Sequence, residues 1–248
     1  MKTLYFISGL PRSGSSVITN ILAQNPDIHS EVNSSLSSIL GAVHSNWDTL
    51  SPSASHKANV LDGLAKGFYS NTSDNQIVFD RNPNWVPLIP LLESVFQKQV
   101  KILICVRNPA EILSSFEKMR KENPLVLYDA DKKLGSNTSV AGRAYHYAAP
   151  EGLLGISHRN IQDAITTGLL DRMLFIDYGR FCGNPKSQTK RIYDFFELPE
   201  FKHDYENIVG DNMGTRNKLV KTTLNCVEYL GLNLYEQYNR EIFWNAWV

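Results

Sequence analysis

The sequence lacks paired cysteines. Its 248 residues include cysteines only at positions 105, 182 and 226, and no two of them form a C-x-x-C pair. Zinc sites and disulfide frameworks depend on closely spaced or numerous cysteines, so neither is supported here. Cys105 lies in the apolar run 101–106, where we expect a small buried residue of the core.

The sequence also lacks a net charge and a long apolar run. Lysine and arginine together number 25, as do aspartate and glutamate, which argues against a nucleic acid or a membrane surface as partner. No stretch approaches the roughly 18 apolar residues of a membrane span, and the apolar run at the N-terminus is too short for a secretory signal. With 42% hydrophobic and 20% charged residues, the composition predicts a soluble, cytoplasmic globular protein.

Short apolar runs alternate with helical patterns along the chain. Strand-like runs occur at Leu4–Ile7, Ile77–Phe79, Ile102–Val106 and Met173–Ile176. Helical patterns occur at Val17–Gln24, Val86–Phe96, Ala110–Lys121, Asn160–Leu170 and Lys186–Glu197. This alternation predicts an α/β fold with a P-loop-like parallel sheet and helices on both of its faces.

Two segments do not fit this alternation. Residues 30–75 are rich in serine and asparagine, with weak periodicity at 36–43 and 60–69, and residues 123–150 are similarly irregular. We interpret both as helical or loop insertions over the sheet edge, where ligand recognition usually takes place. Because no linker rich in glycine or proline divides the chain, we expect residues 1–248 to form a single domain.

The segment Gly9–Ser16 lies between the first strand-like run and the first helical pattern. A strand, a Gly-x-x-x-x-Gly turn and a helix N-terminus together form a cradle for a phosphate group. A nucleoside triphosphatase has lysine directly after the second glycine, but here Ser15 follows Gly14, and the only cation of the loop is Arg12. The segment therefore predicts a phosphate site and disfavours Walker-type ATP chemistry.

A second candidate phosphate site begins where the strand-like run 102–106 ends. Arg107 follows this run, Pro109 suits the first turn of a helix, and Ser115 lies eight residues beyond Arg107. Eight residues are about two helical turns, so Ser115 can face the same crevice as Arg107. A guanidinium fork and a hydroxyl in this arrangement suit a phosphate.

Polar segments follow each of the four strand-like runs. In a parallel sheet these segments meet at the carboxyl edge, where ligands bind. We therefore expect convergence in one cleft of residues 9–16, 80–81, 107–108 and 177–178.

With these motifs the sequence resembles the sulfotransferases that use 3′-phosphoadenosine-5′-phosphosulfate (PAPS). Residues 11–16 resemble the 5′-phosphosulfate loop of that family, and Arg107 with Ser115, around Asn-Pro, resembles its 3′-phosphate motif. Further similarity in residues 79–83, 175–181 and 191–199 extends the resemblance from residue 4 to about residue 200. The resemblance is to tyrosylprotein-sulfotransferase-like members and small bacterial or phage members.

The resemblance implies metal-independent, in-line transfer of a sulfuryl group from PAPS to a hydroxyl or amine, with adenosine 3′,5′-bisphosphate (PAP) as product. The implied acceptor is a small molecule, a glycan or a peptide. Arg12 would contact the bridging and leaving oxygens, and Arg107 and Ser115 would hold the 3′-phosphate. The other implied cofactor contacts are Ser13, Gly14, Ser15 and Ser16 in the loop, Tyr178 at the adenosine, and Arg216, with Lys218 second, at the 3′-phosphate.

The catalytic base has two candidates. A base must be a carboxylate or a histidine within reach of the acceptor's proton. Glu31 follows the first helix, as the catalytic glutamate of tyrosylprotein-sulfotransferase-like members does, although an ungapped alignment places Asn33 there. Asp80 is the alternative, because it ends a strand beside Arg81, which stands where many relatives have a lysine that contacts the transferred group. We rank Glu31 slightly above Asp80.

Two other functions compete with sulfuryl transfer. A P-loop kinase or other ATP-dependent phosphotransferase is disfavoured by Ser15 in place of lysine. A non-catalytic nucleotide-binding relative would keep the phosphate cradle and lack the base.

Overall fold

The computed structural model describes residues 3–50, 54–73, 76–122 and 139–209. Its centre is a sheet of five strands in the order β2-β3-β1-β4-β5, and every neighbouring pair is parallel. The predicted α/β fold with a parallel sheet is therefore confirmed. The strands are β1 (Leu4–Gly9), β2 (Ile28–Glu31), β3 (Ile77–Arg81), β4 (Ile102–Val106) and β5 (Met173–Asp177).

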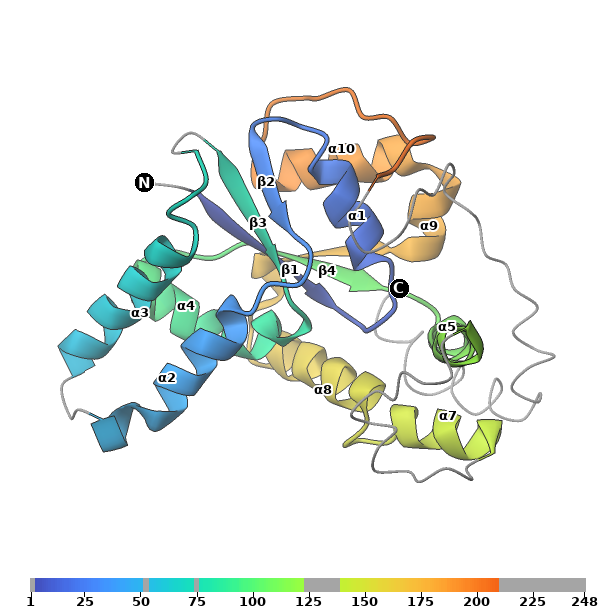
Figure 1. Ribbon diagram of the computed structural model, residues 1–248, viewed down its shortest axis with the longest axis horizontal. Helices are drawn as coiled ribbons and strands as arrows, with labels where there is room; N and C mark the ends of the chain where they lie inside the picture. Colours follow the sequence, from blue (N-terminus) through green and yellow to red (C-terminus); the bar gives the residue numbers. More distant parts are fainter. Residues whose placement is uncertain (1–2, 51–53, 74–75, 123–138, 210–248) are drawn as a thin grey trace.

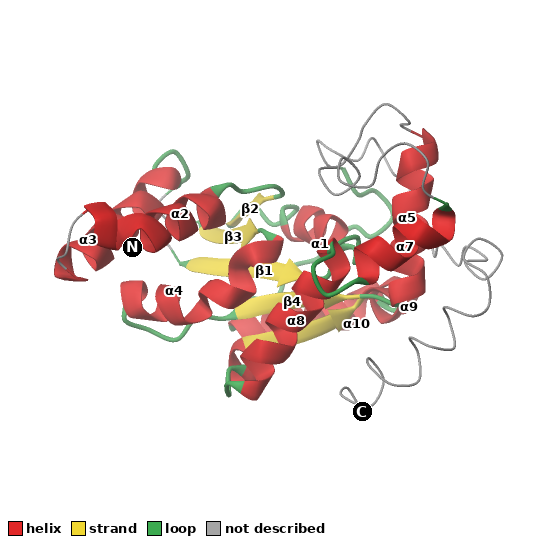
Figure 2. Cartoon of the chain, turned by 90° about the horizontal axis from the view of Figure 1, so that it is seen from below, coloured by secondary structure: helices red, strands yellow, loops and turns green. Residues whose placement is uncertain are grey.

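Helices cover both faces of this sheet (Figure 1). One face carries α1 (Ser15–Leu22), α9 (Tyr178–Gly183) and α10 (Pro185–Phe196). The other carries α2 (Leu36–Leu50), α3 (Ala54–Phe68), η1 (Pro83–Leu88), α4 (Ile89–Phe96) and α8 (Leu153–Thr166). Figures 1 and 2 agree in placing α2 and α3 at one end of the molecule and α5 (Pro109–Glu122) and α7 (Val140–Ala148) at the other. A short helix, η2 (Leu170–Arg172), leads into β5.

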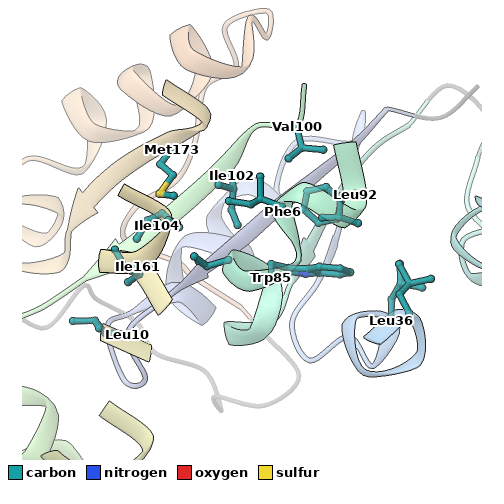
Figure 3. Close-up of a cluster of buried hydrophobic side chains, with 14 of the residues drawn as sticks. Phe6, Leu10, Leu36, Trp85, Leu92, Val100, Ile102, Ile104, Ile161 and Met173 are labelled. Carbon is teal, nitrogen blue, oxygen red and sulfur yellow. The ribbon is translucent and has the colours of Figure 1, made fainter. Parts of the chain in front are cut away.

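Each face of the sheet has its own buried apolar cluster. Phe6, Ile102 and Ile104 point from β1 and β4 toward Trp85 of η1 and Ile161 of α8 (Figure 3). The alternate strand residues face the opposite side, where they pack against α1, α9 and α10. Cys105 belongs to this second cluster and is fully buried, as expected, and burial raises the pKa of its thiol to about 12. Two-sided burial explains why the strands read as continuous apolar runs.

The structure corrects several predicted boundaries. β2, with the sequence Ile-His-Ser-Glu, has no matching prediction, and the region from 86 to 96 divides into the 3₁₀ helix η1, which contains Pro87, and the α-helix α4. The helical pattern at 160–170 belongs to α8, which begins seven residues earlier, at Leu153, and ends at Thr166, before Gly168 with its positive φ of 83°. The short helix α9 was also not predicted. The weakly periodic insertion at 30–75 forms α2 and α3. In the second insertion, at 123–150, the structure describes α7, and residues 123–138 lie outside the described residues.

None of the described helices combines the length and the apolar character that crossing a membrane requires.

The one buried ion pair at the α5–α7 end joins Glu117 to Arg143 through two hydrogen bonds, and within the described ranges it fixes α7 against α5. Beside it, the rings of Phe116 and Tyr147 stack with centroids 4.7 Å apart. These contacts hold α7 against α5, the helix that follows the carboxyl end of β4.

Gly9 allows β1 and β4 to approach each other at this edge. It pairs in register with Cys105, its φ is 126°, and a Cβ placed on it would lie 2.1 Å from the Cys105 carbonyl oxygen. The neighbouring Leu10 N–H donates to that same carbonyl at 2.9 Å. Any other residue would need both a strained φ and a separation of the two strands.

We predict that Gly9→Ala lowers the free energy of unfolding by more than about 2 kcal/mol, because the new methyl group overlaps backbone atoms and the positive φ becomes strained. Gly63→Ala in α3 is the matched control, since a Cβ there meets no atom within 4 Å. It should stabilise the protein by about 0.5–1 kcal/mol. Urea denaturation followed by circular dichroism measures both changes. Equal stability of the two variants would contradict the role given to Gly9.

Candidate functional site

The loop from Leu10 to Gly14 connects β1 to the N-terminus of α1. Gly14 is the N-cap of α1, with φ 84°, and its carbonyl accepts the Val17 and Ile18 N–H groups. Because glycine has no side chain, it cannot cap the first turn of the helix, and no side-chain cap occupies the positive end of α1, where an anion binds favourably. Ser13 is fully buried, and its hydroxyl donates to the Leu10 carbonyl at 2.6 Å, which holds the turn closed.

Arg12 lies exposed at the tip of this loop with a positive φ of 59°. Its Nε donates to the Ser115 hydroxyl of α5 at 3.2 Å, and its carbonyl oxygen accepts from Arg107 at 3.3 Å. The Arg107 Nε also donates to Glu111 at 2.8 Å, one helical turn into α5. The loop is thus bonded to Arg107, which precedes α5, and to Ser115 in the second turn of that helix. Asn108 begins this helix, because its side chain accepts the Ala110 N–H, and Pro109 occupies the first turn as predicted.

Arg81, at the end of β3, approaches the loop from the other side. Its Nε donates to the Ser15 hydroxyl at 2.9 Å, and its NH1 donates to the Val32 carbonyl and, at 2.7 Å, to Asn33 Oδ1. One guanidinium group therefore links the loop to the segment that follows β2. All three acceptors are neutral groups, so none of these hydrogen bonds pairs the charge of Arg81 with a carboxylate.

The site concentrates positive charge in a protein of zero net charge. Burial lowers the pKa of Arg81, and the nearby charge of Arg12 lowers it further. The Arg107 guanidinium carbon lies 5.0 Å from the ring centroid of Tyr178, a cation–π contact. Because the guanidinium groups of Arg12 and Arg81 repel each other beside the N-terminus of α1, the site favours an anion as ligand.

The structure places Asp80 in the interior, away from the cleft. Its side chain is fully buried and accepts hydrogen bonds from Ser34 at 2.5 Å, Tyr69 at 2.6 Å and Trp85 at 2.7 Å. Successive strand residues face opposite sides of a sheet, so Asp80 points inward while Arg81 reaches the loop. This placement contradicts the expectation that Asp80 faces the cleft, where a base would have to be.

The other predicted site residues have different positions. Glu31 is the last residue of β2 and pairs in register with Asp80, but its side chain lies outside what the structure describes. Arg216 and Lys218 lie outside the described residues. Ser16 is in the first turn of α1, and Tyr178 is the first residue of α9, where its side chain is 8% exposed.

The predicted convergence of four polar segments at one edge is confirmed by these contacts. The contacts of segment 32–34 with residues 80–82 were not predicted from the sequence. Asp80 accepts from the Ser34 hydroxyl, Arg81 donates to Val32 and Asn33, and the Asn82 amide donates to the Ser34 carbonyl. The only signal for these contacts was the polar composition of 30–34. The Arg107–Glu111 pair, by contrast, was visible as an i,i+4 spacing.

Comparison with protein families gives one assignment. The sulfotransferase domain family matches residues 2–225, which is most of the chain. Among curated proteins, none matches the chain significantly in sequence.

Three solved structures with a similar fold are described as sulfotransferases or as sulfotransferase domains. The sulfotransferase domain of the curacin biosynthetic pathway has a TM-score of 0.62 and 16% identity, over 94% of this chain and 92% of that one. A sulfotransferase from Alicyclobacillus acidocaldarius has a TM-score of 0.55 and 14% identity, over 82% and 85% of the two chains. The sulfotransferase domain of the Synechococcus PCC 7002 olefin synthase has a TM-score of 0.51 and 21% identity, over 81% and 74%. At these identities the likeness shows the fold alone.

We predict that Asp80→Ala lowers the free energy of unfolding by about 3–5 kcal/mol, because the donor-only Trp85 N–H loses its acceptor in the interior. Asp80→Asn should cost less, about 1–2 kcal/mol, since the Ser34 and Tyr69 hydroxyls can turn to accept from an amide. Asp194→Ala, on the exposed side of α10, is the control and should change stability by less than about 0.5 kcal/mol. Chemical denaturation ranks the three variants, and an Asp80→Ala as stable as the control would refute the buried network.

Proposed function

Because the chain belongs to the sulfotransferase domain family, we propose that it transfers a sulfuryl group from PAPS to a hydroxyl or amine of an acceptor. The observation that carries the proposal is the meeting of Arg12, Arg81 and Arg107 around a loop that has no lysine after its second glycine. A sulfuryl group carries less negative charge than a phosphoryl group. Guanidinium and backbone N–H groups therefore suffice to stabilise the departing phosphate.

Arg12 and the first turn of α1 would bind the 5′-phosphosulfate. Two features support binding of this anion: the N-terminus of α1 has no side-chain cap, and the exposed Arg12 lies in the loop that leads into it. Ser13 contributes its backbone N–H, since its hydroxyl already donates to Leu10. Gly14, Ser15 and Ser16 complete the loop. When bound, PAPS would supply the sulfuryl group: its bond between sulfur and the bridging oxygen breaks as the sulfur bonds to the acceptor, and the bridging oxygen stays with the 5′-phosphate of PAP.

Arg107 and Ser115 would hold the 3′-phosphate. Both already contact Arg12, so the residues that would bind the 3′-phosphate lie next to the residue that would bind the 5′-phosphosulfate. Glu111 accepts from the Nε of Arg107 and the Arg12 carbonyl accepts from its NH1, so NH2 is the group of the guanidinium that would contact the phosphate. We also assign Arg216, with Lys218 as the second choice, to this phosphate.

Glu31 is the base we propose, and it would take the proton that the acceptor loses. Its backbone position supports this role, because it ends β2 directly before the segment that Arg81 ties to the loop. Arg81 would stabilise charge on the transferred group and cannot act as a proton donor. We assign Asp80 to the buried network and not to proton transfer. The acceptor class is a small molecule, a glycan or a peptide.

We predict that the protein binds PAP without metal and that Arg12→Ala weakens this binding at least about tenfold, because charge-assisted hydrogen bonds to the phosphate are lost. Titration calorimetry with PAP in the presence of EDTA measures the affinity. Arg159→Ala, at an exposed position of α8, is the matched control and should leave it unchanged. Preference for ATP with Mg²⁺ over PAP would instead support a phosphotransferase and refute the proposal.

We predict that Glu31→Gln reduces sulfuryl transfer at least about 100-fold while PAP affinity stays within about threefold, because a general base acts on the acceptor and not on the donor. Transfer is measured with ³⁵S-labelled PAPS and a panel of phenols, oligosaccharides and tyrosine peptides. If the wild-type protein binds PAP but labels no member of the panel, a non-catalytic nucleotide-binding protein is favoured. If Glu31→Gln transfers at the wild-type rate, Glu31 is not the base.

A further inference from the structure

Tyr178 occupies the space between Arg107 and the loop of residues 10–15, which we call the anion loop. A Cβ placed on Gly14 would lie 2.0 Å from Cδ2 of the Tyr178 ring and 2.3 Å from Cε2, so the ring rests directly against the N-cap of α1. The Arg107 guanidinium lies over the same ring, 5.0 Å from its centroid. One buried aromatic side chain therefore contacts both halves of the site.

The hydroxyl end of Tyr178 is also engaged by the protein. It hydrogen-bonds the Cys182 thiol, one turn further along α9. Burial raises the pKa of that thiol, and the hydrogen bond from Tyr178 and the charge of Arg107 oppose this shift. With 8% of its surface exposed, Tyr178 has little area left for a nucleotide base.

We propose that Tyr178 is a positioning residue, a rigid spacer that sets the distance between the 5′-anion loop and the 3′-phosphate group Arg107. The inference rests on the proposed function, because it takes Arg107 as the contact to the 3′-phosphate. It replaces the expectation that Tyr178 contacts the adenosine. The ring thereby determines selection for a nucleotide that carries phosphates at both the 3′ and 5′ positions.

The physical basis is preorganisation of the Arg107 guanidinium. Glu111 holds its Nε and the Arg12 carbonyl accepts from its NH1, but both contacts allow the plane of the guanidinium to tilt. The flat face of the Tyr178 ring restricts this tilt through the cation–π contact. A spacer that has only two rotatable bonds loses little entropy on ordering, and an arginine oriented in advance binds phosphate more tightly than a mobile one.

The test compares the affinities of PAP and adenosine 5′-monophosphate, because their ratio isolates the contribution of the 3′-phosphate. For the wild-type protein we expect PAP to bind about 100-fold more tightly, the effect of two charge-assisted hydrogen bonds. In Tyr178→Leu, which keeps apolar volume but removes the ring face, we expect the ratio to fall to about 10 or less. In Tyr178→Phe, which keeps the ring, the ratio should stay within about threefold of the wild type.

Phe195→Ala is the control for general loss of packing, since Phe195 is a partly buried aromatic of α10 in the same apolar cluster and should leave the ratio unchanged. Thermal melts of all variants establish that each is folded during titration. A wild-type protein that does not prefer PAP refutes the proposed function itself. A wild-type preference that survives in Tyr178→Leu, or an equal loss of affinity for both nucleotides, overturns the spacer role. Loss of the ratio in Tyr178→Phe also overturns it, because the hydroxyl and not the ring would then be responsible.

Discussion

The close approach of β1 to β4 at Gly9 is the constraint on which the site depends. Because Gly9 pairs with Cys105 without a side chain between them, Leu10 can bond to the Cys105 carbonyl and the loop turns tightly toward α1. Gly14 allows a similar close approach at the other end of the loop, where the Tyr178 ring occupies the space that a Cβ would need. Two glycines with positive φ thus hold the backbone N–H groups at the carboxyl edge, between the ends of β3 and β4.

The arrangement of charge follows from strand order. β1 lies between β3 and β4, so Arg81 at the end of β3 and Arg107 directly after β4 reach the loop from opposite sides. The Ser15, Val32 and Asn33 groups that accept from Arg81 are neutral, and the charge of Arg81 adds to that of Arg12. The folded chain therefore carries an electrostatic cost at this edge that an anion would offset. A zero net charge is compatible with such a site, because the total of 25 basic and 25 acidic residues does not say how the charges are distributed over the fold.

The sequence predicted the centre of the sheet better than its periphery. β4 and the start of α5 have the predicted bounds within one residue, because a continuous apolar run and an Asn-Pro turn are strong local signals. β2 carries His29 and Ser30 in four residues, and an edge strand of this kind is specified by pairing with β3 rather than by its own pattern. The direction of Asp80 could not be predicted either, since its three donors, Ser34, Tyr69 and Trp85, come from three different segments whose packing around β3 is set by the tertiary fold.

The end of β3 joins the two sides of the site into one unit. Alternation along the strand sends Asp80 inward and Arg81 outward, yet both bind the segment 32–34, and the Asn82 amide adds a third contact. Through Arg81 this segment is also bonded to Ser15 of the anion loop. The backbone that follows Glu31 is thus anchored to the core by a buried carboxylate and to the loop by a guanidinium group. In a sulfotransferase, in-line transfer requires the donor and acceptor oxygens to be aligned across the sulfur. With the roles proposed above for Glu31 and the anion loop, a shared anchor for the segment after Glu31 and for the loop would keep that alignment.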